Sequence, residues 1–123
     1  MALIVEQAAV PFAAEDRWCQ FAIAHPDDDT LLGDIGLYAG RLGTALIGFT
    51  LAISAQGHGY AFEAVSALLV TLRGERPDLE IVAITDARNA PAIALLLRLR
   101  FTLERTNQVT FKGEPCEELR FAL

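Results

Sequence analysis

The chain has 123 residues, of which 53% are hydrophobic and 21% are charged, and this length suits a single domain over residues 1–123. Such a composition excludes a disordered, collagen-like or low-complexity chain. The sequence carries 10 basic and 16 acidic residues, and the resulting net charge of −6 disfavours general binding to nucleic acid or to an anionic membrane surface.

The cysteines, histidines and apolar runs exclude further classes of protein. Cys19 and Cys116 form no CxxC pair, and His25 and His58 stand alone, so we expect neither a disulfide framework nor a metal site. This cysteine usage suits the reducing cytoplasm. No apolar run reaches the roughly 18–20 residues of a membrane span. The start, Met1–Glu6, lacks the basic region of a secretory signal.

The first half of the chain predicts one helix and then three strands. Residues 2–14 are rich in alanine and indicate a short amphipathic helix that is broken near Pro11. Strands are predicted over 17–25, 31–38 and 44–53, with turns at 26–29 and 40–43. Because short turns join these strands in series, we expect them to pair as an antiparallel meander.

The second half alternates helices and strands. Helices are predicted over 61–73 and 90–99, and strands over 79–85, 101–111 and 117–123. Asn89 is a suitable N-cap for the second helix, and Pro91 fits its first turn. The near-continuous apolar run over 79–85 follows a helix and indicates a buried, parallel strand. The expected fold is therefore α/β or α+β, with a mixed sheet and flanking helices.

The segment from Gln56 to Ala61 joins a strand to a helix and carries the clearest chemical signal. Two glycines flank His58, so the backbone can turn sharply and approach a ligand closely. The first amides of a helix lack internal partners and carry partial positive charge, which predicts a phosphate site. The spacing matches neither GxxxxGK[ST] nor GxGxxG, and a tight turn without any ligand is the alternative.

Three linked segments resemble one family. Gln56-x-x-Gly59-x-Ala61 resembles the Q/R-x-x-G-x-G/A pyrophosphate signature of the GNAT acyl-CoA N-acetyltransferases. Residues 48–69 look like that family's fourth strand, loop and third helix, and residues 84–101 look like its fifth strand and following helix. Residues 111–123 are similar to the closing strand of the branch that acetylates ribosomal-protein N-termini and other small amines.

The resemblance implies acetyl transfer from acetyl-CoA to an amine by direct attack in a ternary complex. It implies that the strands ending near Leu51 and Thr85 splay apart around pantetheine, with a backbone N–H near Leu51 polarising the thioester carbonyl. Asn89 matches a family position near the pantetheine arm. The implied pyrophosphate-binding residues are Gln56, Gly57, His58, Gly59, Tyr60 and Ala61. Candidates for the outer phosphate are Arg41, Arg88 and Arg98.

The sequence departs from the family pattern at three positions. Leu46 stands where many members carry a glutamate, Ala92 stands where some carry a proton-donating serine, and Arg100 replaces the glycine of an "LGF" run. The candidate catalytic replacements are Glu117, Glu118 and Tyr60. Asp34 and Tyr38 share one face of a strand and are further candidates for the acceptor side. Ordinary surface or packing roles are the alternative for each.

The chain also resembles a GNAT domain shortened at its N-terminus, without the family's first strand and helix. Because a missing strand leaves a sheet edge open, we hypothesise a homodimer that covers this edge. The favoured function is N-acetyl transfer to a primary amine of a protein N-terminus or of a small molecule. The alternatives are a degenerate, non-catalytic CoA-binding or interaction module, and a truncated core that binds nothing.

Overall fold

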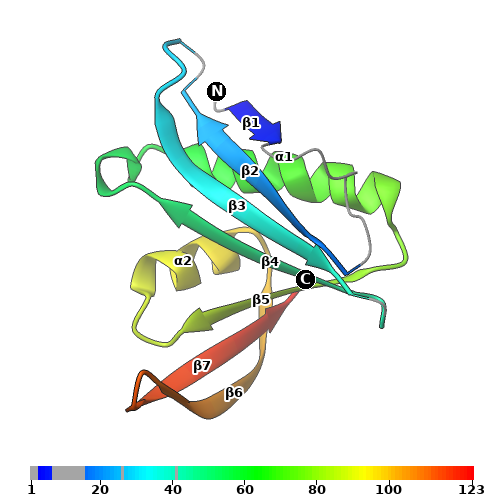
Figure 1. The fold of residues 1–123 in the computed structure, drawn as a ribbon, viewed down its shortest axis with the longest axis vertical. Coiled ribbons are helices and arrows are strands. Elements are labelled where there is room, and N and C mark those ends of the chain that lie inside the picture. Colours follow the sequence, from blue (N-terminus) through cyan, green and yellow to red (C-terminus); the bar gives the residue numbers. More distant parts are fainter. Residues whose placement is uncertain (1–2, 7–15, 26, 41) are drawn as a thin grey trace.

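The structure is a computed structural model, and it describes residues 3–6, 16–25, 27–40 and 42–123 (Figure 1). The strands are β1 (Leu3–Glu6), β2 (Trp18–Ala24), β3 (Leu31–Ala39), β4 (Thr44–Leu51), β5 (Glu80–Asp86), β6 (Thr102–Phe111) and β7 (Glu114–Ala122). The helices are the 3₁₀ turn η1 (Ile53–Ala55), α1 (Tyr60–Glu75) and α2 (Ala90–Arg98).

All seven described strands belong to one mixed sheet. Their order is β1-β2-β3-β4-β5-β7-β6, and β4–β5 is the parallel pair while the other neighbours are antiparallel. This arrangement confirms the predicted meander of three strands and the parallel strand that follows α1. A parallel pair needs a long crossover connection, and α1 provides it between β4 and β5.

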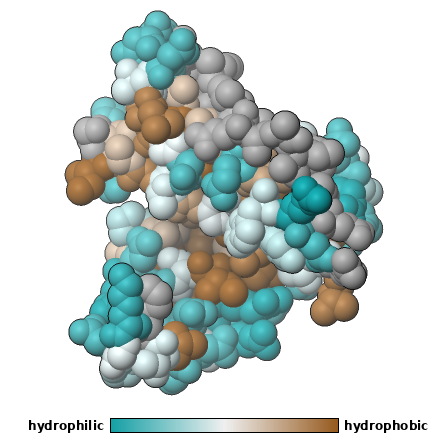
Figure 2. All heavy atoms as spheres, in the orientation of Figure 1, coloured by the Kyte–Doolittle hydropathy of each residue, from teal (hydrophilic) through white to brown (hydrophobic). Residues whose placement is uncertain are grey.

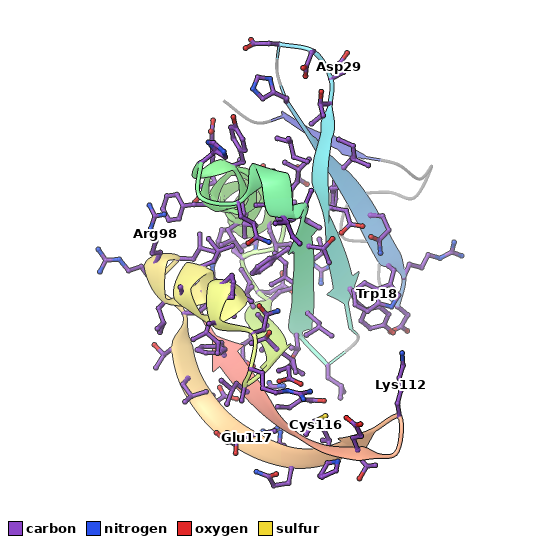
Figure 3. The ribbon with its side chains drawn as sticks, turned by 90° about the vertical axis from the view of Figure 1, so that its left-hand side faces the viewer. Trp18, Asp29, Arg98, Lys112, Cys116 and Glu117 are labelled. Carbon is purple, nitrogen blue, oxygen red and sulfur yellow. The ribbon has the colours of Figure 1, made fainter. Side chains whose placement is uncertain are left out.

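Both α-helices cover the same face of the sheet, as Figure 3 shows from the side. Side chains alternate between the two faces of a strand, and one set of them is buried, including Ile35, Ile47 and Phe121. This set packs with Leu68 and Leu72 of α1 in a single core. The two helices therefore stand side by side above the central strands, which brings both of their N-termini close to the end of β4.

The start of the chain differs from the sequence prediction. Residues 3–6 form the strand β1, which pairs antiparallel with β2, instead of the expected helix over 2–14. The four residues Leu-Ile-Val-Glu contain no alanine and include two β-branched side chains, which favour a strand paired with β2. The edge of β2 that was expected to be open pairs with β1. The reason given for a homodimer is therefore removed, and the homodimer stays a prediction. Residues 7–15, including Pro11, lie outside the described residues.

The face of the sheet opposite α1 and α2 carries a shallow apolar hollow of about 460 Å³. It is lined by Asp16, Tyr38, Gly40, Leu42, Thr44, Leu46, Val82, Ile84 and Arg120. Hydrophobic residues also gather near the middle of the face seen in Figure 2. Arg120 is held there by the carboxylates of Glu104, at 2.7 Å, and Glu80, at 3.4 Å.

Several element boundaries lie close to the predicted ones. Strand β4 ends at Leu51 rather than at residue 53, and α1 continues through Gly74 to Glu75. The closing hairpin is tighter than expected, because Lys112 and Gly113 alone make its turn, with φ of 52° and 80°. Among the described helices, none is both long enough and apolar enough to span a membrane.

Candidate active site

The parallel strands β4 and β5 separate partway along their length. Their pairing runs from Thr44 opposite Glu80 to Ile47 opposite Ala83. Beyond this point β4 continues along β3 as far as Leu51, whereas β5 continues along β7 as far as Asp86. The last four residues of β4 therefore have no neighbouring strand on their β5 side, and a gap opens in the middle of the sheet.

The backbone of β4 points alternately toward β3 and toward this gap. The carbonyl of Gly43 accepts from the Glu80 N–H on the β5 side, and the Ala52 N–H donates to the Leu32 carbonyl on the β3 side. Because these directions alternate along an extended strand, the N–H and C=O groups of Phe49 and Leu51 point into the gap. The Leu51 N–H, which the family resemblance implies as a donor to the thioester carbonyl, therefore points into the gap.

The loop between β4 and α1 leads into backbone donors that have no partner within the helix. Gly57 and Gly59 have φ of 82° and 78°, in the left-handed region that glycine adopts without steric cost. The first hydrogen bond of α1 runs from the Glu63 N–H to the Gly59 carbonyl, so the three preceding N–H groups of the helix have no partner within it. Together with the helix dipole, these groups form a small positive region at the mouth of the gap.

Two adjoining cavities connect this loop to the end of β4. The inner cavity, of about 240 Å³, is lined by Phe49, Thr50, Leu51, Gln56, Asn89, Pro91, Ala92 and Leu95. The outer cavity, of about 230 Å³, is lined by Gly57, Gly59, Phe62, Pro91, Ala94, Leu95 and Arg98. Since Pro91 and Leu95 line both, we treat them as one groove, called here the loop–strand groove.

The N-terminus of α2 forms one wall of the loop–strand groove. The side chain of Asn89 accepts a hydrogen bond from the Ala92 N–H at 3.2 Å, which confirms the predicted N-cap. Gln56 is anchored to the end of β4, because its side-chain amide donates to the Leu51 carbonyl at 3.3 Å. The methyl group of Ala92 faces the inner cavity at the position where some family members carry serine.

Arg98 is the cationic residue that lines the groove. Its guanidinium lies 4.3 Å from the centre of the Phe62 ring, and Figure 3 shows it at the end of α2 nearest α1. Of the other arginines proposed for the outer phosphate, Arg88 pairs instead with Asp86 at 2.9 Å. Arg41 lies outside the described residues.

The three predicted catalytic residues do not meet in the groove. Glu117 is exposed on β7, where it accepts from the Gln108 amide at 2.9 Å. Glu118 stands between Asp86 of β5 and Asn107 of β6. Neither glutamate lines the groove.

Tyr60 contacts two histidine rings and does not line the groove. It lies at the start of α1, stacked on His58 at 5.3 Å between ring centroids and edge-on to His25 at 5.7 Å. Tyr60 is also partly buried against the core, which fits its packing alternative. The residues predicted to bind the pyrophosphate are thus adjacent in space, and of these Gln56, Gly57 and Gly59 line the groove.

Two polar pairs beside the gap were not predicted as pairs. The Thr50 hydroxyl donates to the Asp34 carboxylate at 2.5 Å across β3 and β4. The Arg88 side chain and backbone N–H hold the pKa of Asp86 down to about 2. The described residues contain no group of three or more His, Cys, Asp or Glu side chains that could hold a metal ion.

Comparison with known proteins identifies the fold and the family. Residues 4–102 match the acetyltransferase (GNAT) domain family. The chain belongs to the GNAT acetyltransferase family. Members of this family use acetyl-CoA as co-substrate. A search of curated protein sequences found no significant match.

Solved structures of GNAT proteins share this fold at low sequence identity. A GNAT acetyltransferase from Bacillus anthracis is 22% identical, with a TM-score of 0.77, and the alignment covers 85% of this chain and 64% of that one. RimL, a ribosomal L7/L12 alpha-N-protein acetyltransferase solved with coenzyme A, is 24% identical, with a TM-score of 0.75 and coverage of 86% and 61%.

A spermidine N-acetyltransferase from Vibrio cholerae is 17% identical, with a TM-score of 0.75 and coverage of 86% of this chain and 64% of that one. This GNAT chain therefore spans less than two-thirds of the length of the structures it resembles. At these identities the likeness shows the fold alone.

Proposed function

We propose that this domain binds acetyl-CoA in the loop–strand groove and transfers the acetyl group to a primary amine. The acceptor class is a protein N-terminus or a small-molecule amine, and the reaction is direct attack in a ternary complex in the cytoplasm. The observation that carries the proposal is the gap between β4 and β5, which opens beside the unpaired N–H groups at the start of α1.

Each part of acetyl-CoA has a chemical counterpart along the groove. The free N–H groups after Gly59 suit a pyrophosphate, since a helix N-terminus attracts anions. The free edge of β4 suits pantetheine, whose amides can pair with an unpaired strand. The Leu51 N–H suits the thioester oxygen, because a fixed donor aimed at developing negative charge lowers the barrier to acyl transfer.

A second candidate is a GNAT domain that binds CoA without catalysing transfer. Ala92 places a methyl group in the inner cavity, and Leu46 provides no carboxylate, so both family proton-transfer positions are aliphatic. A panel of primary amines separates the two functions. Acetyl transfer above the rate without protein supports catalysis, and binding of acetyl-CoA without any transfer supports the second candidate.

Isothermal titration with acetyl-CoA and with CoA tests the groove itself. Gly59→Glu places a carboxylate beside the proposed pyrophosphate site, and we expect affinity to fall about 100-fold, since like charges in contact cost several kcal/mol. Any side chain at this position also carries backbone strain, because Gly59 has a φ of 78°. Gly59→Ala supplies the strain without the charge and should bind within a few-fold of the parent.

Gly113→Glu is the matched control for the added charge. Gly113 has a φ of 80°, nearly that of Gly59, but it lies in the β6–β7 turn and not in the groove. Gly113→Glu should therefore bind CoA like the parent chain. Equal affinities of the Gly59→Glu and Gly113→Glu variants would place the ligand elsewhere and refute the proposed site.

A further inference from the structure

We propose that Thr50 is a catalytic residue which contacts the acceptor amine, and that Asp34 is a positioning residue which receives the amine's proton through the Thr50 hydroxyl. This inference rests on the proposed acetyl transfer. It supplies the proton acceptor that Leu46, Ala92, Glu117 and Glu118 do not supply in this groove. Its starting observation is a carboxylate hydrogen-bonded to a residue that lines the inner cavity.

The pairing of β3 and β4 brings the two side chains together. Asp34 stands directly opposite Thr50 in the antiparallel register, and the Thr50 hydroxyl donates to Asp34 Oδ1 at 2.5 Å. Their neighbours Ile35 and Phe49 are also paired and belong to the helix-covered side. Asp34 and Thr50 therefore point to the other face of the sheet, away from α1 and α2.

Thr50 connects this other face to the loop–strand groove. It lines the inner cavity together with Leu51 and Ala92, although those residues meet it from the helix-covered side. This is possible because β5 has separated from β4 at this level and leaves the gap open. An amine that approaches from the uncovered face can reach the Thr50 hydroxyl at the position where the thioester is expected.

The backbone around Thr50 is fixed by a close approach of β3. A Cβ atom on Gly33 would lie 2.1 Å from the Thr50 carbonyl oxygen and 2.9 Å from Leu51 Cα, so only glycine fits here. The Ala52 N–H then donates to the Leu32 carbonyl at 2.7 Å. The end of β4 is thus held in place on its β3 side, and the Thr50 side chain keeps a defined position.

The hydrogen-bond direction determines what Thr50 offers to a substrate. Its hydroxyl proton is donated to the Asp34 carboxylate, so the remaining lone pairs of Oγ1 can accept a hydrogen bond. Near pH 7 a primary amine is an ammonium ion, which can donate hydrogen bonds but cannot accept them. Thr50 therefore binds the ammonium by accepting one of its N–H groups, and the nearby carboxylate charge favours this cation.

Proton transfer through Thr50 to Asp34 precedes the attack on the thioester. One ammonium proton moves to Thr50 Oγ1 while the Thr50 proton moves to Asp34 Oδ1, which leaves a neutral amine. The nitrogen lone pair attacks the thioester carbonyl carbon and forms the C–N bond. The C–S bond breaks, its electron pair leaves on the CoA sulfur, and a second proton from the nitrogen neutralises that thiolate. Asp34 finally returns its proton to water.

Other carboxylates near the gap are engaged away from the groove. Asp86 is bound by Arg88 through two contacts of 2.9 Å, and Glu117 accepts from Gln108. Within the part of the chain that the structure describes, Asp34 is the carboxylate that hydrogen-bonds to a residue lining the inner cavity. This distinguishes Asp34 from Glu117 and Glu118, the candidates predicted from the sequence.

The test uses the full chain, acetyl-CoA, and two acceptor probes, spermidine and a synthetic peptide with a free N-terminal serine. Asp34→Asn keeps an acceptor for the Thr50 hydroxyl but removes the charge, and Thr50→Val removes the hydroxyl while keeping the shape. We expect each to lower kcat about 100-fold or more, within the range for loss of a proton acceptor. Because Asp34 does not line the groove, the titration of Asp34→Asn with CoA should match that of the parent chain.

Three further measurements separate this role from a structural one. Thr50→Ser keeps the hydroxyl and should restore kcat to within a few-fold of the parent. Asp34→Asn should flatten the acidic limb of the kcat profile, which reports the proton acceptor in the ternary complex. Asp29→Asn, in an exposed turn, should leave kcat and its pH profile unchanged.

The outcomes separate this inference from the function beneath it. If the parent chain acetylates a probe and Asp34→Asn retains its kcat, the role of Asp34 and Thr50 is wrong while the transferase function stands. Loss of CoA binding in Asp34→Asn also overturns the role, because it shows a structural effect. If the parent chain binds acetyl-CoA but acetylates neither probe, the transferase proposal fails and this inference fails with it.

Discussion

Asp86 and Arg88 form a tightly connected pair where β5 leaves the gap. The Asp86 carboxylate accepts from the Arg88 side chain at 2.9 Å through each of its two oxygens, and from the Arg88 backbone N–H at 2.8 Å. The hydrogen bonds from the Arg88 side chain are the largest cause that lowers the pKa of Asp86 from 3.8 to about 2. The pair orients the short loop that leads into the Asn89 cap of α2.

The lowered pKa predicts how this pair responds to pH. Because the pKa of Asp86 is lower in the folded chain, the pair contributes stability above pH 3.8, and this contribution is lost as the pH falls toward about 2. Arg88→Met removes the guanidinium, and we expect the pKa of Asp86 to rise toward 3.8, measured by NMR titration of its carboxyl carbon. Arg105→Met on exposed β6 is the control, and a pKa that stays near 2 in Arg88→Met would contradict the assignment.

At the scale of residues, the sequence predicts local contacts. It misses contacts that depend on which residues of two strands stand opposite each other. The Asn89 cap follows from three neighbouring residues, and the structure confirms it. The Asp34–Thr50 contact joins residues 16 positions apart and depends on which residues of β3 and β4 stand opposite each other. Asp34 was a candidate for the acceptor side, but no sequence pattern indicated Thr50 as its partner.

At the scale of elements, the C-terminus of α2 shows the effect of an arginine at the position where the family has glycine. The Phe101 N–H donates to the Leu96 carbonyl and the Arg100 N–H to the Leu97 carbonyl, which is the Schellman arrangement. This places Arg100 at a φ of 74°, where helices usually have glycine. The turn therefore forms with Arg100 in the strained position, where the family's "LGF" run has glycine.

Arg100→Gly is expected to stabilise the domain by about 1 kcal/mol, since a left-handed conformation costs roughly 1–2 kcal/mol for a residue with a Cβ. Chemical denaturation of the parent and variant chains measures this difference. Arg100→Ala is the matched control, because it removes the charge and keeps the Cβ. The interpretation fails if the glycine variant is no more stable than the alanine variant.

The elements themselves were predictable to different degrees. The strong apolar periodicity of α1 and the buried run of β5 gave the helix, the strand and their parallel crossover from sequence alone. Strand β1 was mistaken for a helix, because four residues carry little periodicity and their partners in β2 lie 15 to 21 positions away. The separation of β4 from β5 came from the family resemblance, since no local pattern specifies where two strands part.

At the scale of the whole molecule, an acidic chain has to bind a polyanion. The net charge of −6 opposes the approach of CoA, so attraction must come from groups within the groove. The free N–H groups after Gly59 supply partial positive charge, and Arg98 supplies a full one. On the opposite face, Asp34 suits a cationic amine, so the two faces of the gap favour ligands of opposite charge.

A ligand that occupies the groove contacts β4, the α1 loop and α2 together, so its binding should stabilise the whole fold. Binding to the folded chain alone, at a concentration about 100 times Kd, adds about 2.7 kcal/mol. For a domain of this size we expect Tm to rise by roughly 10 °C, since each kcal/mol shifts it by several degrees. Thermal unfolding with and without CoA measures the shift, and Gly59→Glu should lose it while Gly113→Glu keeps it. Equal Tm values with and without saturating CoA in the parent chain would mean that the groove does not bind this ligand, because a site that joins three elements of one cooperative domain cannot fill without raising its stability.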